Sequence, residues 1–454
     1  MPNVTSAEKF QLKIDSIAPG GDGVGRLADG RAVFVPYAAA GDGVEALLTE
    51  EHKTYARAKI LRIVEAGPAR VTPPCPVAGR CGGCAWQHID YKAQAEAKAG
   101  FIRESLRRIG GFAEPPVTGV LAAADPLGYR NKGQVPVSLA PDGSLRMGYY
   151  REGSHDVVAL PDEGCRLLAP AVDQALLYVR AQLPGLGLQP YDQKSGEGTL
   201  RHVMVRANSA GQAMAVLVTR TPMTVAQNAK AAAWLGQAGI VSVQNNLQAK
   251  TGNVILGTET LLLAGEANLL ESMDGLKFRL SATSFFQVNT AQATALVGVL
   301  KGIRPWAAGE HVLELYCGVG TLSLPLGKLG LRLRGVENHA AAVEDARANA
   351  ILNAIQGVSF TVAEALRAFD GLPPDFKPQV LLMDPPRKGM DPGIFKALEK
   401  HPVPEIVYVS CDPPSLSRDL KQLAAMGWTL KRTQGVDLFP QTPHVESVSW
   451  LVRA

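Results

Sequence analysis

The sequence has no run of 18 or more apolar residues, and its first ten residues lack the hydrophobic core of a signal peptide. A transmembrane helix needs about 20 consecutive apolar residues, so the sequence excludes such a span and argues against secretion. The chain also has little excess charge, because 46 basic and 42 acidic residues leave a formal net charge of only +4. That charge is compatible with nucleic-acid binding but does not indicate it. We therefore expect a cytoplasmic protein with no membrane partner.

Low-complexity stretches and internal repeats are missing too, although 46 glycines and 31 prolines predict many turns. Hydrophobic residues make up 46% of the chain and charged residues 19%, which favours folded cores over disorder. At about 100–200 residues per domain, 454 residues allow two to four domains. Cysteine is scarce, with six residues. Without an export signal, these fit metal ligands or nucleophiles better than disulfides.

Residues 7–66 alternate apolar and polar residues in short runs that glycines separate. The runs predict four or five strands with tight turns, which is the pattern of a small oligonucleotide-binding β-barrel. Nucleic-acid binding is one interpretation, and a small β-domain of another kind is the alternative. The expected strands lie at residues 10–17, 32–36, 44–48 and 55–64.

A helix is expected from Asp90 to Gly110, where apolar residues recur at helical spacing. Its basic residues suggest a charged face, which is usually only solvated but could contribute to nucleic-acid binding. These residues are Lys92, Lys98, Arg103, Arg107 and Arg108.

The rest of the chain changes character near residue 276. Residues 125–265 form a glycine-rich mixed region with expected strands at 135–139, 202–207 and 213–219. From about Leu276 onward, strands and helices alternate, which predicts a parallel α/β sheet.

A glycine turn, Gly318-Val-Gly320, follows an apolar strand that begins near His311. Glycines there let the backbone approach a ligand closely. A dinucleotide fingerprint would need a third glycine where Ser323 stands. Glu337 ends the next strand, where a carboxylate can accept hydrogen bonds from ribose hydroxyls. With Glu314 ahead of the turn, the pattern indicates a nucleoside-type cofactor such as S-adenosylmethionine.

Three later segments carry candidate catalytic groups at strand ends. Asp384 and Cys411 each follow an apolar strand. Two prolines come directly after Asp384, and Asp-Pro-Pro comes directly after Cys411, so both side chains are expected at the ligand edge of the sheet. Cys411 is a candidate nucleophile, whereas Cys317 fits a buried small hydrophobe. Glu446 begins the last strand as a candidate proton acceptor, and His444 is a rival base.

A cysteine cluster with C-x5-C-x2-C spacing lies between the barrel and the predicted helix. It consists of Cys75, Cys81 and Cys84, with Cys165 as the candidate fourth ligand. Four thiolates can close a zinc or an iron–sulfur site, and the spacing alone leaves that choice open. Radical enzymes with open clusters use C-x3-C-x2-C, so the longer first gap favours a closed site.

Five motifs occur in the order typical of the RNA uracil-5-methyltransferases that make 5-methyluridine, and the chain resembles this family over essentially its whole length. The motifs are Ser284-Phe-Phe-Gln-Val-Asn289, Glu314-Leu-Tyr-Cys-Gly-Val-Gly320, Met383-Asp-Pro-Pro-Arg-Lys-Gly389, Ser410-Cys-Asp-Pro-Pro-Ser415 and Pro443-His-Val-Glu-Ser447. The N-terminal barrel is similar to the RNA-binding TRAM domain of that family.

The resemblance implies a multidomain α/β protein in three parts. Residues 1–68 would form a TRAM-like, OB-like RNA-binding β-barrel. Residues 69–270 would form a mixed central domain with an iron–sulfur cluster. Residues 271–454 would form a Rossmann-like class I methyltransferase that uses S-adenosylmethionine. No obligate protein partner is inferred.

The resemblance also implies residue roles. Cys411 would add to carbon 6 of uracil, and Glu446 would remove the proton from carbon 5 of a base that has left its stack. The four cysteines would hold a 4Fe–4S cluster, as in one branch of the family. The implied cofactor contacts include the two glycines of the turn. They are Gln287, Tyr316, Gly318, Gly320, Thr321, Glu337, Glu364 and Asp384.

The expected substrate is 23S ribosomal RNA, because bacterial relatives with the cysteine cluster mostly act on it. The same chemistry on the T-loop uridine of transfer RNA is the alternative. A noncatalytic RNA-binding assembly factor is a third possibility, which intact Cys411, Glu446 and Asp384 argue against.

Overall fold

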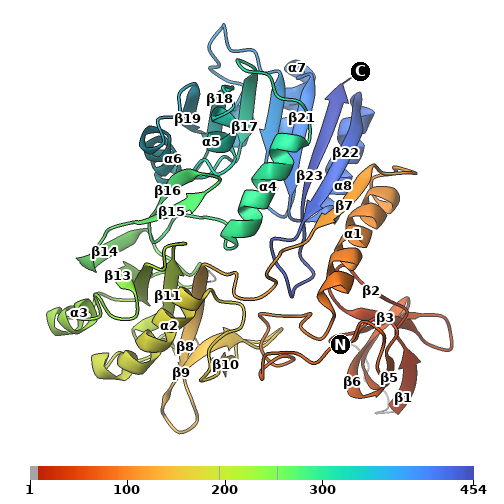
Figure 1. Ribbon diagram of the computed structural model, residues 1–454. Coiled ribbons are helices and arrows are strands. Elements are labelled where there is room, and N and C mark those ends of the chain that lie inside the picture. The colour runs from red at the N-terminus through yellow and green to blue at the C-terminus, as the bar shows by residue number, and fades with distance from the viewer. Residues whose placement is uncertain (1–8, 194, 253, 454) are drawn as a thin grey trace.

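The computed structural model describes residues 9–193, 195–252 and 254–453 as three sheets and one separate hairpin (Figure 1). The first eight residues of the expected N-terminal domain lie outside the described part. Within the described ranges, every helix is too short or too polar to cross a membrane.

The N-terminal sheet has six strands in the order β1-β5-β6-β4-β3-β2. Alternate side chains of these strands, such as Val33, Val35, Val44 and Ala46, are buried in a common core. The expected small β-domain is confirmed, but the run at 10–17 divides into two strands and the turn-rich segment adds a third. The strands are β1 (Lys9–Lys13), β2 (Ser16–Ile17), β3 (Gly23–Arg26), β4 (Ala32–Val35), β5 (Gly43–Glu51) and β6 (Tyr55–Glu65).

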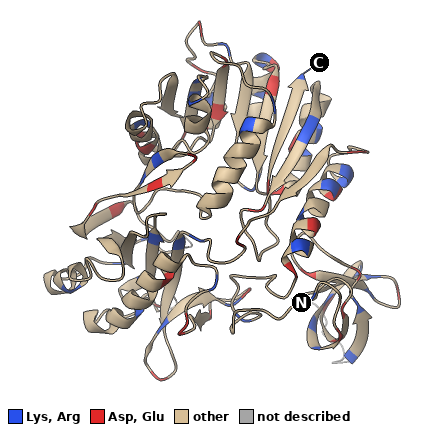
Figure 2. Cartoon of the chain, in the orientation of Figure 1, with Lys and Arg blue, Asp and Glu red and all other residues tan. Residues whose placement is uncertain are grey.

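Helix α1 (Tyr91–Arg108) confirms the expected helix. It begins at Asp90 because the Asp90 carboxylate accepts hydrogen bonds from the backbone N–H groups of Lys92 and Ala93, at 3.0 and 3.4 Å. The expected basic face is wrong in one residue. Lys98 lies on the buried face and is fully enclosed, because Asp437 neutralises its charge there. The other basic residues of α1 are exposed, and Figure 2 marks the basic positions along this helix in blue.

The central sheet has seven strands in the order β10-β9-β8-β11-β12-β13-β14. Helix α2 (Pro170–Gln182) packs on β8, β11 and β12, and α3 (Val225–Ala232) packs beside β14. The expected strands of this region are confirmed. These three are β8 (Lys132–Leu139), β11 (Leu200–Ala207) and β12 (Ala213–Thr219). The sheet has four further strands that were not expected, β9 (Leu145–Tyr150), β10 (Val157–Ala159), β13 (Ile240–Leu247) and β14 (Glu259–Gly265).

The C-terminal sheet has eight strands in the order β19-β18-β17-β20-β21-β23-β22-β7. The first five are parallel, and β23 is antiparallel to both of its neighbours. The strands are β17 (His311–Leu315), β18 (Arg332–Glu337), β19 (Val358–Val362), β20 (Val380–Met383), β21 (Glu405–Ser410), β22 (Trp428–Val436), β23 (Glu446–Arg453) and β7 (Val117–Leu121). Strand β7 comes from the part of the chain expected to be central.

Strands and helices alternate from Leu276 as expected, but the first strand of this series does not belong to the parallel sheet. Residues 269–280 form a separate antiparallel hairpin of β15 (Leu269–Met273) and β16 (Leu276–Leu280), because apolar residues alternate on both strands. The parallel sheet begins at β17.

Helices cover both faces of the C-terminal sheet (Figure 1). Strand β20 shows why, since Val380 and Leu382 join the core of one face while Leu381 and Met383 join the other. The first face packs against α4 (Thr290–Gly302), α5 (Ser323–Gly327) and α6 (Ala340–Leu352). The second packs against α1, α7 (Pro392–Lys400) and α8 (Pro413–Ala425). The strand order reverses between β17 and β20, where open α/β sheets bind ligands at the carboxyl ends of the strands.

Candidate functional site

A cavity of about 560 Å³ opens where β17, β18, β20 and β21 end and β23 begins. Seven of the ten residues expected to bind cofactor or perform catalysis line this cavity. They are Gln287, Tyr316, Gly318, Glu337, Asp384, Cys411 and Glu446. The structure thus brings together residues that span 160 positions of the chain, from 287 to 446.

The loop after β17 forms one wall. Tyr316 has a left-handed backbone with φ 64°, which turns the chain sharply at the end of the strand. The Glu337 carboxylate accepts hydrogen bonds from the backbone N–H groups of Gly318 at 3.3 Å and His339 at 2.9 Å. These bonds hold the carboxylate beside the glycine turn.

Three expected cofactor residues are not among the residues that line the cavity. Gly320 has φ 86° in the turn, and Thr321 follows it. Glu364 precedes a short 3₁₀ helix, and its charge acts on the Tyr316 hydroxyl. Contacts between these three residues and a cofactor stay predictions.

Glu314 lies beneath the glycine turn. It is almost fully buried and accepts a hydrogen bond from the Ser323 hydroxyl. Burial raises the pKa of the Glu314 carboxyl to about 8. The Ser323 side chain, at the position where a dinucleotide fingerprint has its third glycine, thus supplies a hydrogen-bond partner for a buried carboxyl.

The reactive groups come from three neighbouring strands. Cys411 follows β21, and Asp384 follows β20. Glu446 begins β23, as expected, and is only 5% exposed. The register pairs Ser410 with Ser447, so Cys411 and Glu446 form the next opposed pair beyond the end of the ladder.

Burial controls the protonation of these groups. It raises the pKa of the Cys411 thiol to about 12, and the negative charges of Glu446 and Asp384 add to the shift. It also raises the pKa of Asp384 to about 7. The pKa of Glu446 lies well above its usual range because of burial and the nearby Asp384 charge. Two carboxyls and one thiol thus share a region that disfavours negative charge.

Arg387 lines the cavity and was not singled out by the sequence. Its positive charge lowers the pKa of both Cys411 and Glu446, opposing the effect of burial. The Asp-Pro-Pro-Arg motif contained this signal, because the turn that delivers Asp384 also delivers Arg387.

His444, the rival base, lies beside this arginine and outside the lining of the cavity. Its Nε2 is 3.3 Å from Arg387 Nη2. Burial lowers the pKa of His444 to about 4, and the Arg387 charge adds to that effect. The geometry therefore favours Glu446 over His444 as the proton acceptor.

Two aromatic residues complete the cavity. The Phe285 side chain is 68% exposed although it is apolar, and Phe439 is partly buried in the same lining. An exposed phenyl ring at the mouth of a cavity offers a flat apolar surface to an unstacked base.

The four cysteines of the predicted metal site line a second cavity of about 180 Å³. Burial raises the pKa of the Cys84 thiol to about 12, and the charges of Cys165, Cys81 and Cys75 raise it further. In residues 9–193, 195–252 and 254–453, however, no three His, Cys, Asp or Glu side chains lie close enough together to hold a metal ion. The structure thus gathers Cys75, Cys81, Cys84 and Cys165 without a formed ligand set.

Comparisons with known proteins agree with this architecture. The tRNA (Uracil-5-)-methyltransferase family matches residues 268–454, and the TRAM domain matches residues 5–61. An uncharacterized RNA methyltransferase of Gloeobacter violaceus is 42% identical over 98% of this chain and 96% of its own. One from Listeria innocua is 36% identical over 98% and 97%.

A solved structure is similar over nearly the whole chain. It is the Pyrococcus abyssi tRNA (uracil-54, C5)-methyltransferase in complex with S-adenosyl-L-homocysteine. The TM-score is 0.77 and the sequence identity 26%, with 97% of this chain and 99% of that chain covered.

Proposed function

Because the chain belongs to the tRNA (uracil-5-)-methyltransferase family of RNA methyltransferases, we propose that it methylates carbon 5 of a specific uridine in 23S ribosomal RNA. The general activity follows from the family: S-adenosylmethionine-dependent methylation of RNA uracil, by a chain with an N-terminal TRAM domain. The substrate, the residue roles and the domain limits at 68 and 270 are our proposals.

One observation supports the residue roles above all others. The Cys411 thiol and the carboxyls of Asp384 and Glu446 line a single cavity together with the glycine turn and Glu337. A nucleophile, a proton acceptor and a nucleoside-binding loop are the groups that this reaction needs.

The chemistry explains the choice of these residue types. Carbon 5 of uracil is too weak a nucleophile to accept a methyl group unaided. In the proposed mechanism the Cys411 thiolate adds to carbon 6, which makes carbon 5 enolate-like and nucleophilic. S-adenosylmethionine, when bound, supplies the methyl group from its sulfonium. Glu446 then takes the proton from carbon 5, and elimination of the thiolate restores the double bond.

The electrostatics of the cavity suit this sequence of steps. A carboxyl whose pKa is raised holds a proton more firmly than an ordinary glutamate, which favours removal of a proton from carbon by Glu446. The Cys411 thiol, with a pKa of about 12, is protonated before RNA binds. It must therefore pass its proton on as the uridine enters. Asp384, whose pKa is about 7, is the available acceptor, which leaves the Glu446 carboxylate free to take the proton from carbon 5.

The residues present fit a nucleoside cofactor. Each oxygen of the Glu337 carboxylate accepts one backbone hydrogen bond and has the capacity to accept another from a ribose hydroxyl. Gln287, Tyr316, Gly318 and Asp384 line the same cavity and would bind the rest of the cofactor. Gly320, Thr321 and Glu364 would contribute from the surrounding loops.

RNA that carries 5-fluorouridine at the target position tests the mechanism, because fluorine cannot leave as a proton. Wild-type protein should form a covalent adduct that survives denaturing electrophoresis, and Cys411→Ala should form none. Glu446→Gln should accumulate the adduct on unmodified RNA. No adduct with wild-type protein, or an adduct with Cys411→Ala, contradicts the proposed roles.

We also propose that Cys75, Cys81, Cys84 and Cys165 hold a 4Fe–4S cluster. Four thiols around one cavity match the donor set of a closed iron–sulfur site. Iron and sulfide analysis of anaerobically purified protein should give about four of each per chain. About one zinc without sulfide contradicts the cluster and indicates a structural zinc site instead.

Transfer RNA is the second candidate substrate, because the similar Pyrococcus abyssi enzyme acts on tRNA uracil-54. Purified protein should be offered 23S ribosomal RNA and transfer RNA separately, with methyl-labelled cofactor. Mass-spectrometric mapping of 5-methyluridine should find the label in ribosomal RNA. Label in transfer RNA alone contradicts our choice of substrate while preserving the chemistry.

A further inference from the structure

The loop of residues 437–445 joins β22 to β23 and leads directly into Glu446. It also carries Phe439, which lines the catalytic cavity. Loops usually run over the surface, yet here Asp437, Leu438 and Gln441 are all buried. The contacts that hold this loop therefore decide where the proposed base lies.

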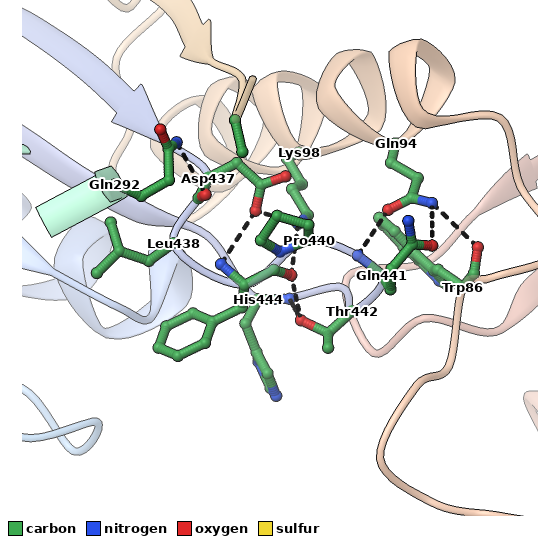
Figure 3. Close-up of polar contacts among 12 residues, drawn as sticks. Trp86, Gln94, Lys98, Gln292, Asp437, Leu438, Pro440, Gln441, Thr442 and His444 are labelled. Atoms are coloured by element: carbon green, nitrogen blue, oxygen red, sulfur yellow. Dashed lines mark hydrogen bonds and ion pairs between the residues drawn. The ribbon is translucent and has the colours of Figure 1, made fainter. Parts of the chain in front are cut away.

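A fully buried ion pair anchors the beginning of the loop to α1. The Lys98 ammonium lies 2.6 Å from Asp437 Oδ1, and both side chains are 0% exposed (Figure 3). The Tyr91 hydroxyl donates to Asp437 Oδ2 at 3.0 Å, and the Phe439 N–H donates to Oδ1 at 3.2 Å. Each oxygen of this buried carboxylate thus has a partner.

A paired amide anchors the middle of the loop to the same helix. Gln94 Nε2 donates to Gln441 Oε1 at 2.9 Å, and the Gln441 backbone N–H donates back to Gln94 Oε1 at 3.0 Å (Figure 3). Gln94 Nε2 also donates to the carbonyls of Trp86 and Ile89. Gln441 has a left-handed backbone with φ 67°, a conformation that a glutamine keeps only when its surroundings hold it.

Five consecutive carbonyls of the loop, 437 to 441, all accept hydrogen bonds from outside it. The donors come from four parts of the chain: α1, the region around α4, the segment that follows the cysteine cluster, and the segment between β7 and β8. In order they are Gln292 at 2.9 Å, Asn289 at 3.3 Å, Lys98 at 3.1 Å, Tyr129 at 3.0 Å and the Trp86 N–H at 3.0 Å. A segment with five consecutive carbonyls satisfied in this way has one defined path.

We propose that Lys98 and Gln94 are positioning residues for methyl transfer, which hold the 437–445 loop so that Glu446 and Phe439 face Cys411. This inference rests on the proposed roles of Cys411 and Glu446. Neither Lys98 nor Gln94 lines the cavity, so both act through the loop. Lys98 holds the beginning of the loop through Asp437, and Gln94 holds the middle of the loop through Gln441.

Misplacement of Glu446 should slow removal of the carbon 5 proton more than it slows RNA binding. A displacement of about 1 Å at a reacting group can lower a rate by about 100-fold. We therefore expect Gln94→Met to lower kcat by about 10-fold and Lys98→Met by about 100-fold, with the KM for RNA nearly unchanged. In both variants the covalent adduct should accumulate on normal RNA, and a deuterium isotope effect at carbon 5 should appear.

The experiment first counts competent sites by titration with 5-fluorouridine RNA, and then measures kcat per titrated site. Partial unfolding lowers the number of sites but leaves kcat per site and the isotope effect unchanged. Glu96→Met is the matched control, since Glu96 lies exposed on the same helix and outside its basic face. It should keep the wild-type kcat per site and isotope effect.

The outcomes separate the two proposals. If wild-type protein forms no adduct with 5-fluorouridine RNA, the proposed catalytic roles fail. If wild-type protein forms it, but Gln94→Met has wild-type kcat per site and no isotope effect, the positioning role fails. Gln94→Met keeps the test decisive even if Lys98→Met does not fold, because it leaves no buried charge without a partner.

Discussion

The protonation of Cys411 can be tested without RNA. At pH 8 an ordinary cysteine with a pKa of 9.0 is about one-tenth ionised, whereas a thiol with a pKa of about 12 is ionised in about one molecule in 10,000. A thiolate of higher pKa is also intrinsically more nucleophilic, which recovers roughly 20-fold of this thousandfold difference. Cys411 in the folded protein should therefore react about 50-fold more slowly than the same cysteine in unfolded protein.

Alkylation by iodoacetamide measures this difference. The Cys411 peptide is followed by mass spectrometry, with urea-unfolded protein as the reference and Cys411→Ala to identify the peptide. Between pH 7 and pH 9 the rate of Cys411 alkylation in folded protein should rise about tenfold for each pH unit. It should not reach a plateau, because the thiol titrates far above that range.

Two variants should change the rate in opposite directions. Asp384 has a pKa of about 7, so at pH 9 it carries a negative charge that disfavours the Cys411 thiolate. Asp384→Asn should therefore speed alkylation. Arg387 lowers the pKa of Cys411, so Arg387→Gln should slow alkylation. A plateau below pH 9 in wild-type protein, or a change of the same sign in both variants, refutes this account of the site.

Two further predictions concern the N-terminal and central sheets, away from the candidate site. Burial raises the pKa of Asp42, but hydrogen bonds from Arg70, Gly67 and Ala39 outweigh it, and the net pKa is lowered. Asp42→Asn should therefore lower the free energy of unfolding by about 1–3 kcal/mol at pH 7. This loss should shrink as the pH falls below about 4 and through the lowered pKa of the folded state, because wild-type Asp42 then becomes protonated as well. Thermal melts of both proteins at pH 7 and at about pH 3 measure the loss, and an equal loss at the two pH values contradicts this account. Gly148→Ala would put a Cβ 1.8 Å from the Val158 carbonyl oxygen, so the β9–β10 wall of the cysteine cavity must open. We expect Gly148→Ala to destabilise the protein by about 1–3 kcal/mol and to lower its iron content. The control is Gly100→Ala in α1, where the added Cβ meets open space, and it should be neutral or stabilising by about 0.5–1 kcal/mol. Equal melting temperatures for the two variants would contradict the clash at Gly148.

The strand ends that carry the candidate site were predictable because local sequence contains both the strand and its end. An apolar run that stops at glycine or proline defines where Gly318, Asp384 and Cys411 leave the sheet. The carboxyl ends of parallel strands share one edge, so their meeting in one cavity follows from the strand order.

Contacts between distant segments were not predictable in the same way. Helical spacing groups Lys98 with other basic residues, but it does not show what covers that face of α1. The answer is Asp437, which lies 339 residues further along the chain. Strand β7 joins the C-terminal sheet for a similar reason, since only the assembled β22 offers it an edge.

The antiparallel strand β23 explains why a tightly held loop is needed at this site. The parallel strands deliver Cys411 and Asp384 from their carboxyl ends, but β23 runs the other way and reaches the same edge with its first residue, Glu446. A shift of one residue in its register would turn the Glu446 side chain to the opposite face of the sheet. The ladders with β21 and β22 set this register, and the buried anchors of the preceding loop to Lys98 and Gln94 reinforce it from a helix outside the ladder, where Glu446 enters the sheet.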